Sequence, residues 1–551
     1  MRETGSTTDS DFSLSSRRSI RRIIACYFLA TFGASTLVLP QFHGAERVEF
    51  HFEDMVIPIP IDELNIWNRD LNAENNDEEL KTTSELGYWL NMLGFNSRGA
   101  LSNFLEAPFI KDESMTRQLL RSWAGRKLLD EISDLIVIDN DKTGVKLFNT
   151  LESLLEDQEQ VSLLDLLKSL PAEVIHFDLD GWLKVISSWK NELSLQQKFL
   201  KDLNAFSSNN SLLESKESVQ NELKESLNEI VRVPVGHRPK ELEVEIWRPL
   251  ARSSSRENWI VFMPGLGGDQ SHFRWLSRSL SHQGWEVVLI DHPGSNSEAM
   301  SSFVEGRNPV PGGVEVFPYR LADLSAVLDL KEKELLDVKG EKVVLMGHSL
   351  GSLISFLASG ATPQNRLLDR CNKALDDLSI TNLSRLLQCQ IVDLPLEEQN
   401  EISSLAAIVG INSFGKLLWP DSLSAEINVP ILLTGGTFDL ITPAISEQLG
   451  LLLSTKSNKF SRALIIEGAS HFSPIRVADQ KVDVRQNDLY QISDALVGFH
   501  PLSVQSLLAR EIAGFLDNLE RSKSLPVSTN VTSNGLKFHL LDRNSIIKIL
   551  D

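Results

Sequence analysis

The pattern of apolar and polar residues changes along the chain near residue 232. Between about Thr82 and Leu193, apolar residues recur at helical spacing, as in SMTRQLLRSWAGRKLLDEI and VSLLDLLKSL. We therefore predict a mainly helical domain at residues 46–193. It opens with alternating apolar residues in ERVEFHF and VIPIPIDELNIW, which predict a short hairpin that leads into a helix. Residues 194–232 keep helical spacing but are charged and rich in serine and asparagine, which predicts a partly solvated helical linker.

Residues 233–521 alternate between short apolar runs and amphipathic stretches, which is typical of an α/β protein. The runs ELEVEIW, NWIVFM, WEVVLI, KVVLM, AAIVGI, PILLTGG and RALII predict strands. Because parallel strands are joined through helices that pack on the faces of the sheet, we expect a mostly parallel sheet with helices on both faces. A long insertion interrupts this pattern at about 362–405. A polar C-terminal tail follows at 522–551, in which GLKFHLLD predicts a short strand.

A serine stands between two glycines in LMGHSLGSL, directly after the strand KVVLM and before the helix LGSLISFLA. This context predicts a sharp strand–turn–helix elbow that lifts the hydroxyl of Ser349 off the edge of the sheet as a nucleophile. Gly347 and Gly351 fit such an elbow, because the turn brings backbone segments too close together to leave room for a Cβ atom. The alternative is that Ser349 only caps an ordinary turn.

A serine hydroxyl becomes a strong nucleophile only when a neighbouring base takes its proton, and an acid must orient that base. In this kind of fold the acid and then the histidine follow the serine along the chain, each on a loop after a strand. Asp439 ends LLTGGTFD, and His471 follows LIIEGAS. We therefore predict that Ser349, Asp439 and His471 form a catalytic triad.

Other candidates fit the triad less well. His348 lies inside the elbow, where we expect it to pack or to shape the site. His272, His282 and His292 precede the serine and would require another topology. Asp421 precedes the strand of the predicted acid and is a weaker alternative.

The oxyanion of an acyl-transfer reaction needs two preorganised hydrogen-bond donors. We predict that one is the backbone N–H of Leu350 and that the other comes from the loop PGLGG at 264–268, with Leu266 as the donor. Neither a GxGxxG nor a Walker pattern accompanies this loop, so a nucleotide site is not predicted. The chain also carries no HExxH motif and no closely spaced histidines and cysteines, so we predict neither a metal nor another cofactor.

Charge and the N-terminus bear on partners and location. The formal charge of −21, from 75 acidic and 54 basic residues, repels phosphate backbones and argues against nucleic-acid binding. Residues 1–45 combine arginines at 17–22 with an apolar run at 23–40, which predicts an export signal. The signal is either cleaved or retained as a membrane anchor.

The pieces MPGLGGDQSHFRWLSRSLSHQGWEVVLIDHPGSN, GHSLGS, TGGTFDLITPA and EGASHFSP resemble α/β hydrolases of the predicted dienelactone hydrolase type, whose lipase-like relatives include platelet-activating-factor acetylhydrolases. Residues from 46 to about 193 resemble the N-terminal domain of unknown function that precedes such hydrolases in cyanobacteria. The resemblance implies an α/β-hydrolase fold and a hydrolase with the triad above. With the leader, it implies export to the periplasm, to the thylakoid lumen or out of the cell.

The chain departs from this pattern at two points. Pro264 stands where the family usually has a histidine before the glycine of the oxyanion loop, so a side chain that often stiffens the loop is missing. The nucleophile is a serine, whereas true dienelactone hydrolases use cysteine, and the family's substrate name is therefore not carried over.

Two of the three cysteines, Cys371 and Cys389, lie in the insertion. In an oxidising compartment they could pair, and two buried free thiols are the alternative. The pieces RCNKALDD and RLLQCQ resemble the cap region of this group of hydrolases, and that resemblance favours a disulfide.

From these residues we expect a serine esterase or lipase that cleaves a small-molecule or lipid ester through an acyl-enzyme. Acyl transfer on the same triad and a non-catalytic binding protein are the alternatives. We expect the insertion to lie near the site and to govern access. The N-terminal domain would shield one side of the entrance, or else contact a partner or a membrane surface. The oligomeric state is not predicted.

Overall fold

The computed structural model describes residues 45–52, 55–64, 108–110, 132–139, 144–157, 161–206, 227–250, 256–304, 316–376, 382–394, 402–420, 427–439, 441–476 and 500–550. The predicted export signal, up to residue 44, lies outside these residues. Within the described ranges, no helix combines the length and the apolar character that crossing a membrane requires.

A ten-stranded sheet organises the larger part of the chain, in the order β15-β16-β14-β13-β12-β11-β9-β10-β8-β7. Its six central strands are parallel: β9 (Asn258–Met263), β10 (Val287–Ile290), β11 (Lys342–His348), β12 (Leu405–Ile411), β13 (Ile431–Gly436) and β14 (Arg462–Ile466). Antiparallel strands extend both edges: β7 (Leu227–Val233) and β8 (Leu242–Arg248) on one side, β15 (Ser528–Ser533) and β16 (Leu536–Leu541) on the other. The predicted mostly parallel sheet is thus confirmed.

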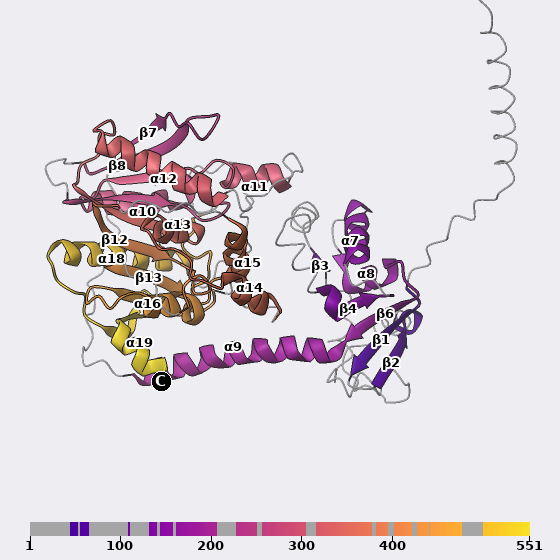
Figure 1. Cartoon of the computed structure of the whole chain (residues 1–551). Coiled ribbons are helices and arrows are strands. Elements are labelled where there is room, and N and C mark those ends of the chain that lie inside the picture. The colour runs from indigo at the N-terminus through magenta and orange to yellow at the C-terminus, as the bar shows by residue number, and fades with distance from the viewer. Residues whose placement is uncertain are drawn as a thin grey trace, which may run out of the picture.

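Helices cover both faces of this sheet (Figure 1). The first face packs against α10 (Arg274–His282) and α18 (Pro501–Glu520), and the second against α12 (Val316–Glu332), α13 (Leu350–Ala358), α16 (Gly450–Ser454) and α19 (Arg543–Leu550). Strand β11 illustrates the division, because Val344 and Met346 belong to the first core while Val343 and Leu345 belong to the second. Residues buried on both faces explain why the central strands are continuous apolar runs. Shorter helices complete the unit: η2 (Gln270–Phe273), α11 (Ser297–Val304) and η4 (Ala444–Leu449).

The boundaries of this unit differ from the prediction. β7 starts at Leu227, inside the predicted linker, and β15, β16 and α19 occupy most of the predicted tail at 522–551. The two outermost strands are largely solvent-facing, since β7 is exposed over its first four residues and no residue of β15 is fully buried. An edge strand faces water on one side and can be polar, which is why these segments do not read as strands in the sequence.

The N-terminal unit contains a four-stranded sheet in the order β2-β1-β6-β4. The strands of this sheet are β1 (Arg47–Phe52), β2 (Met55–Pro60), β4 (Ile136–Ile138) and β6 (Val174–Asp178). The same unit contains the helices α7 (Val145–Asp157) and α8 (Leu163–Ser169) and a separate strand pair, β3 (Pro108–Ile110) with β5 (Val161–Ser162). The predicted hairpin is confirmed as β1 and β2. The mainly helical prediction omits β4 and β6, because three and five residues are too few for a clear alternating pattern. Much of the segment predicted as helix lies outside the described residues.

A 27-residue helix, α9 (Leu179–Ala205), connects the two units (Figure 1). Asp178 at the end of β6 caps it by accepting a hydrogen bond from the Gly181 amide. At the other end, Phe199 and Leu203 are buried in the core of the larger unit. The first residues of the predicted linker, 194–205, therefore belong to a helix that is anchored at both ends.

The insertion forms a small helical cap from α14 (Leu367–Asp376), α15 (Ser384–Cys389) and η3 (Gln390–Asp393). A disulfide joins Cys371 to Cys389 with their Cα atoms 5.5 Å apart, so the pairing favoured by the resemblance is confirmed. Disulfides are typical of oxidising compartments, which agrees with export. The Ser384 amide donates to the Ile441 carbonyl at 2.9 Å, which ties the cap to the loop that follows Asp439.

Replacing both Cys371 and Cys389 by serine should loosen the cap. The disulfide closes a loop with a sequence separation of 18, and such a loop stabilises a fold by about 3 kcal/mol. We expect a lower melting temperature for the variant and the same decrease for wild-type protein in reductant. The double variant in reductant is the control, because it has no disulfide left to reduce, and its melting temperature should not fall further. Equal melting temperatures for wild type and double variant would contradict the prediction.

Candidate active site

Ser349 lies in a strained elbow between β11 and α13. Its backbone has φ 51° and ψ −118°, a region that residues with a Cβ atom rarely adopt. A Cβ atom on Gly351 would overlap the carbonyl oxygen of Met263, and one on Gly347 would overlap the backbone of Gly351. The sharp turn predicted from the two glycines is therefore present, and Ser349 stands at its apex, 6% exposed.

Asp439 and His471 lie in direct contact. His471 Nδ1 is 3.0 Å from Asp439 Oδ2, and both residues are buried. The carboxylate is held by further donors: Oδ1 accepts from the amides of Ile441 (2.9 Å) and Thr442 (2.8 Å), while Oδ2 accepts from the Thr442 hydroxyl (2.6 Å) and from Asn412 Nδ2 (2.7 Å). The acid is therefore fixed in one orientation toward the imidazole.

The electrostatics keep this acid ionised. Burial alone would raise the pKa of Asp439, but the positive charge that His471 carries when it is protonated, together with the hydrogen bonds from His471 and Thr442, outweighs it, and the pKa lies below its usual value. An ionised carboxylate can only accept, so His471 Nδ1 carries the proton and donates it. This tautomer leaves His471 Nε2 with the free lone pair that a general base needs.

His348 links the elbow to the histidine loop. Its Nε2 lies 3.0 Å from the backbone carbonyl of His471, and the two rings are 4.9 Å apart. Burial and the neighbouring charge of His471 lower the pKa of His348 to about 3, so the ring is neutral and its Nε2–H donates to that carbonyl. His348 thus positions the His471 loop from the residue next to Ser349, consistent with the shaping role expected from the sequence.

The structure brings two of the three predicted residues, Asp439 and His471, into a hydrogen bond, and the third, Ser349, is the chain neighbour of His348, whose ring contacts His471. Within the described part of the chain, the Ser349 hydroxyl makes no hydrogen bond to His471. Hydrogen bonds between a nucleophile and its base are often loose before substrate binds. Ser349 is connected to the pair through His348, whose ring packs on His471.

The loop after β9, which the sequence predicts to supply an oxyanion donor, lies against the elbow. A Cβ atom on Gly265 would stand 2.8 Å from His348 Nδ1 and 3.2 Å from Ser349 Cβ, so only glycine allows this approach. Leu266 follows in the same loop and is half-buried. The Leu350 amide opens α13, where no carbonyl of the same helix can accept from it.

A buried arginine of α12 holds this loop in place. The Arg320 guanidinium, fully buried, donates to the carbonyls of Pro264 (2.5 Å) and Gly265 (2.8 Å). It also donates to the hydroxyl (2.8 Å) and the carbonyl (3.3 Å) of Ser295. Arg320 therefore stiffens the loop that Pro264 leaves without the usual histidine.

Three residues of the site escaped the sequence analysis. Thr442 follows the acid by three residues and Asn412 follows β12, so both occupy loop positions that could have suggested a role. Arg320 lies on α12, before the serine in the chain, and nothing in the sequence around it indicated a role in the site. Among the weaker candidates, His292 pairs with Asp323 at 2.9 Å, and Asp421 lies outside the described residues.

The strain at Ser349 predicts a stability difference between two variants that both lack the hydroxyl. Glycine adopts the φ and ψ of Ser349 without a steric clash, whereas alanine keeps the Cβ atom. We expect Ser349→Gly to exceed Ser349→Ala by about 1 kcal/mol in the free energy of unfolding, measured by denaturant unfolding. An alanine variant that is equally stable or more stable would contradict strain at this turn.

Comparison with known families gives two matches. Residues 44–178 match the family described as "Alpha/beta hydrolase of unknown function (DUF1400)", and residues 258–368 match the family described as "alpha/beta hydrolase fold". The second range covers the strands from β9 to β11, the elbow and the Arg320 helix. A comparison with curated proteins finds no match.

Among solved structures, the chain is similar to the dienelactone hydrolase from Anabaena variabilis ATCC 29413, with 16% identity, a TM-score of 0.32, and coverage of 53% of this chain and 98% of that one. Sheet, helices and family matches agree that this protein has the α/β-hydrolase fold, which supports hydrolytic activity in general.

Proposed function

We propose that this protein is a serine hydrolase that cleaves carboxylic esters. The observation that carries the proposal is the buried pair of Asp439 and His471 beside the strained Ser349 elbow. A carboxylate with five donors, one of them an imidazole, is costly to assemble in a core and serves little purpose in a passive scaffold. In an α/β-hydrolase fold this arrangement activates a serine.

The proposed reaction follows from the proton positions. His471 Nε2 takes the proton of the Ser349 hydroxyl as the oxygen attacks the ester carbonyl, and Asp439 stabilises the resulting imidazolium. The carbonyl oxygen, now negatively charged, accepts from the backbone N–H groups of Leu350 and Leu266. Collapse expels the alcohol, which takes the proton from His471. Water then attacks the acyl-enzyme by the same route and releases the acid.

Arg320 contributes in this scheme as a positioning residue. Its hydrogen bonds to Pro264 and Gly265 hold the carbonyls of the loop away from the substrate, which orients the next N–H groups toward the oxyanion. Preorganised donors stabilise the transition state because they need no reorganisation during the reaction.

The surroundings of the acid loop favour an apolar ester. Phe438, next to Asp439, is 53% exposed, and Leu383 of the cap is 40% exposed beside the Ser384 contact to that loop. Two exposed apolar side chains close to the acid loop suit contact with an acyl chain or a lipid surface. We therefore propose a lipid-like ester as substrate and the cap as the element that governs access, in a protein exported to an oxidising compartment.

A fluorophosphonate probe and a panel of esters test the proposal. The probe should label wild-type protein and leave Ser349→Ala unlabelled, because the probe needs the activated hydroxyl. Hydrolysis of p-nitrophenyl esters should fall at least about a thousandfold in the same variant. Ser359→Ala, which removes a buried serine at the end of α13, is the matched control and should keep both signals.

Equal labelling of wild type and Ser349→Ala would overturn the proposal in favour of a non-catalytic scaffold. Labelling without ester hydrolysis, together with transfer of the acyl group to an added alcohol, would replace hydrolysis by acyl transfer on the same residues.

Arg320→Lys and Arg320→Met should separate positioning from folding. Lysine keeps the charge but cannot span Pro264, Gly265 and Ser295 together, so we expect kcat to fall about tenfold or more with a smaller change in KM. Methionine should be worse than lysine. A kcat that stays unchanged in a folded Arg320→Met protein, judged by near-ultraviolet circular dichroism, would contradict the positioning role.

A further inference from the structure

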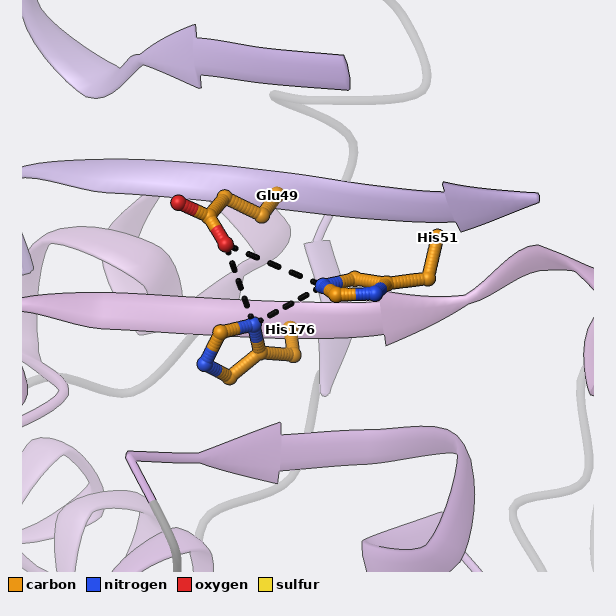
Figure 2. Close-up of side chains that lie close together, drawn as sticks. All are labelled: Glu49, His51 and His176. Carbon is orange, nitrogen blue, oxygen red and sulfur yellow. Dashed lines mark hydrogen bonds and ion pairs between the residues drawn. The ribbon is translucent and has the colours of Figure 1, made fainter. Parts of the chain in front are cut away.

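Three side chains of types that can bind a metal ion converge in the N-terminal unit, far along the chain from the proposed active site. Glu49 and His51 lie on β1, and His176 lies on β6 (Figure 2). His51 Nε2 is 2.9 Å from His176 Nδ1, and Glu49 Oε2 is 3.3 Å from His176 Nδ1 and 3.7 Å from His51 Nε2. Two nitrogens and one oxygen therefore surround a single point.

The sheet itself produces this convergence. β1 and β6 pair in parallel, with Glu49 directly opposite His176, so these side chains emerge on the same face. Glu49 and His51 are two residues apart and share that face. Val48 and Ile175 point the other way into the core, which fixes the register. The three side chains are partly exposed, between 16% and 41%, so an ion could reach them from solvent.

The distances fit a tetrahedral zinc ion. With bond lengths of about 2.0–2.1 Å, two ligands of such an ion lie about 3.3–3.4 Å apart. The three distances of the cluster, 2.9, 3.3 and 3.7 Å, bracket this value. The rings of His51 and His176 are inclined by 68°, so their ring nitrogens can face one point without stacking. We propose that Glu49, His51 and His176 bind Zn²⁺, with solvent as the fourth ligand.

The neighbouring charges are compatible with a cation. Arg47 Nε donates to Glu49 Oε1 at 2.8 Å, which leaves Oε2 for the metal and orients the carboxylate. Arg47 also contributes a positive charge nearby, which Glu173, 4.0 Å from its guanidinium, partly offsets.

Sequence spacing conceals this cluster, because His176 is 125 residues from His51. Imidazole and carboxylate together are a ligand set that suits zinc. A bound ion would cross-link the first strand of the sheet to the strand that leads into α9. Zinc binding should therefore stabilise the N-terminal unit, independently of the proposed esterase activity.

Zinc titration of the chelator-treated full chain tests the site, with a chromophoric chelator as competitor. We expect one tightly bound Zn²⁺ per chain. His51→Gln and His176→Gln should each weaken binding at least about a hundredfold, and Glu49→Gln by a smaller factor. Zinc should raise the melting temperature of wild-type protein but not of the two histidine variants. Cobalt-substituted wild type should show the intense visible absorption of four-coordinate Co²⁺, and His176→Gln should lose it.

His500→Asn is the matched control, because it removes an exposed histidine outside the cluster and asparagine tolerates its left-handed backbone (φ 50°). It should bind zinc like wild type. The proposal is overturned if wild type retains no more zinc than His176→Gln, or if the control loses as much as the cluster variants. Circular dichroism of each variant excludes misfolding as the cause.

Discussion

The close approach of α13 to the end of β9 is the constraint on which the proposed site depends. Gly351 lies so near the Met263 carbonyl that any side chain there would displace one of the two segments. This contact forces the turn at Ser349 into its strained backbone and aligns the start of α13 with the loop after β9. The same packing presses Gly265 against His348 and Ser349. Nucleophile, neighbouring loop and helix terminus are thus placed by one steric requirement.

The polar groups of the site depend on hydrogen bonds instead, and almost every one of them has a partner. Asp439 accepts from backbone, amide, hydroxyl and imidazole, and such a saturated carboxylate costs little to bury. His348 is a counterexample, because its Nδ1 has no hydrogen-bond partner among the described residues while its Nε2 supports the His471 loop. The core therefore accepts one unsatisfied nitrogen at the junction between elbow and base.

Sequence reasoning succeeded where local chemistry dictates local structure. The parallel strands are buried on both faces and therefore appear in the sequence as continuous apolar runs, which predicted them correctly. Gly347 and Gly351 likewise indicated the elbow. It failed where the outcome depends on distant neighbours. The polar edge strand β15 is a strand only because β16 pairs with it, and Arg320 matters only because α12 packs under the loop at Pro264. The role of His176 likewise depends on the pairing of β6 with β1, which no spacing rule records.

Helix α9 spans a defined length between the two units. At 1.5 Å per residue, its 27 residues form a rod about 40 Å long. One end is capped by Asp178, two residues beyond His176, and near the other end Gln196 donates to the carbonyl of Thr437, two residues before Asp439. α9 therefore joins the strand that carries His176 to the loop that carries Asp439 through one continuous helix. The separation between the small sheet and the acid loop is thus set by the number of helical residues between Asp178 and Gln196.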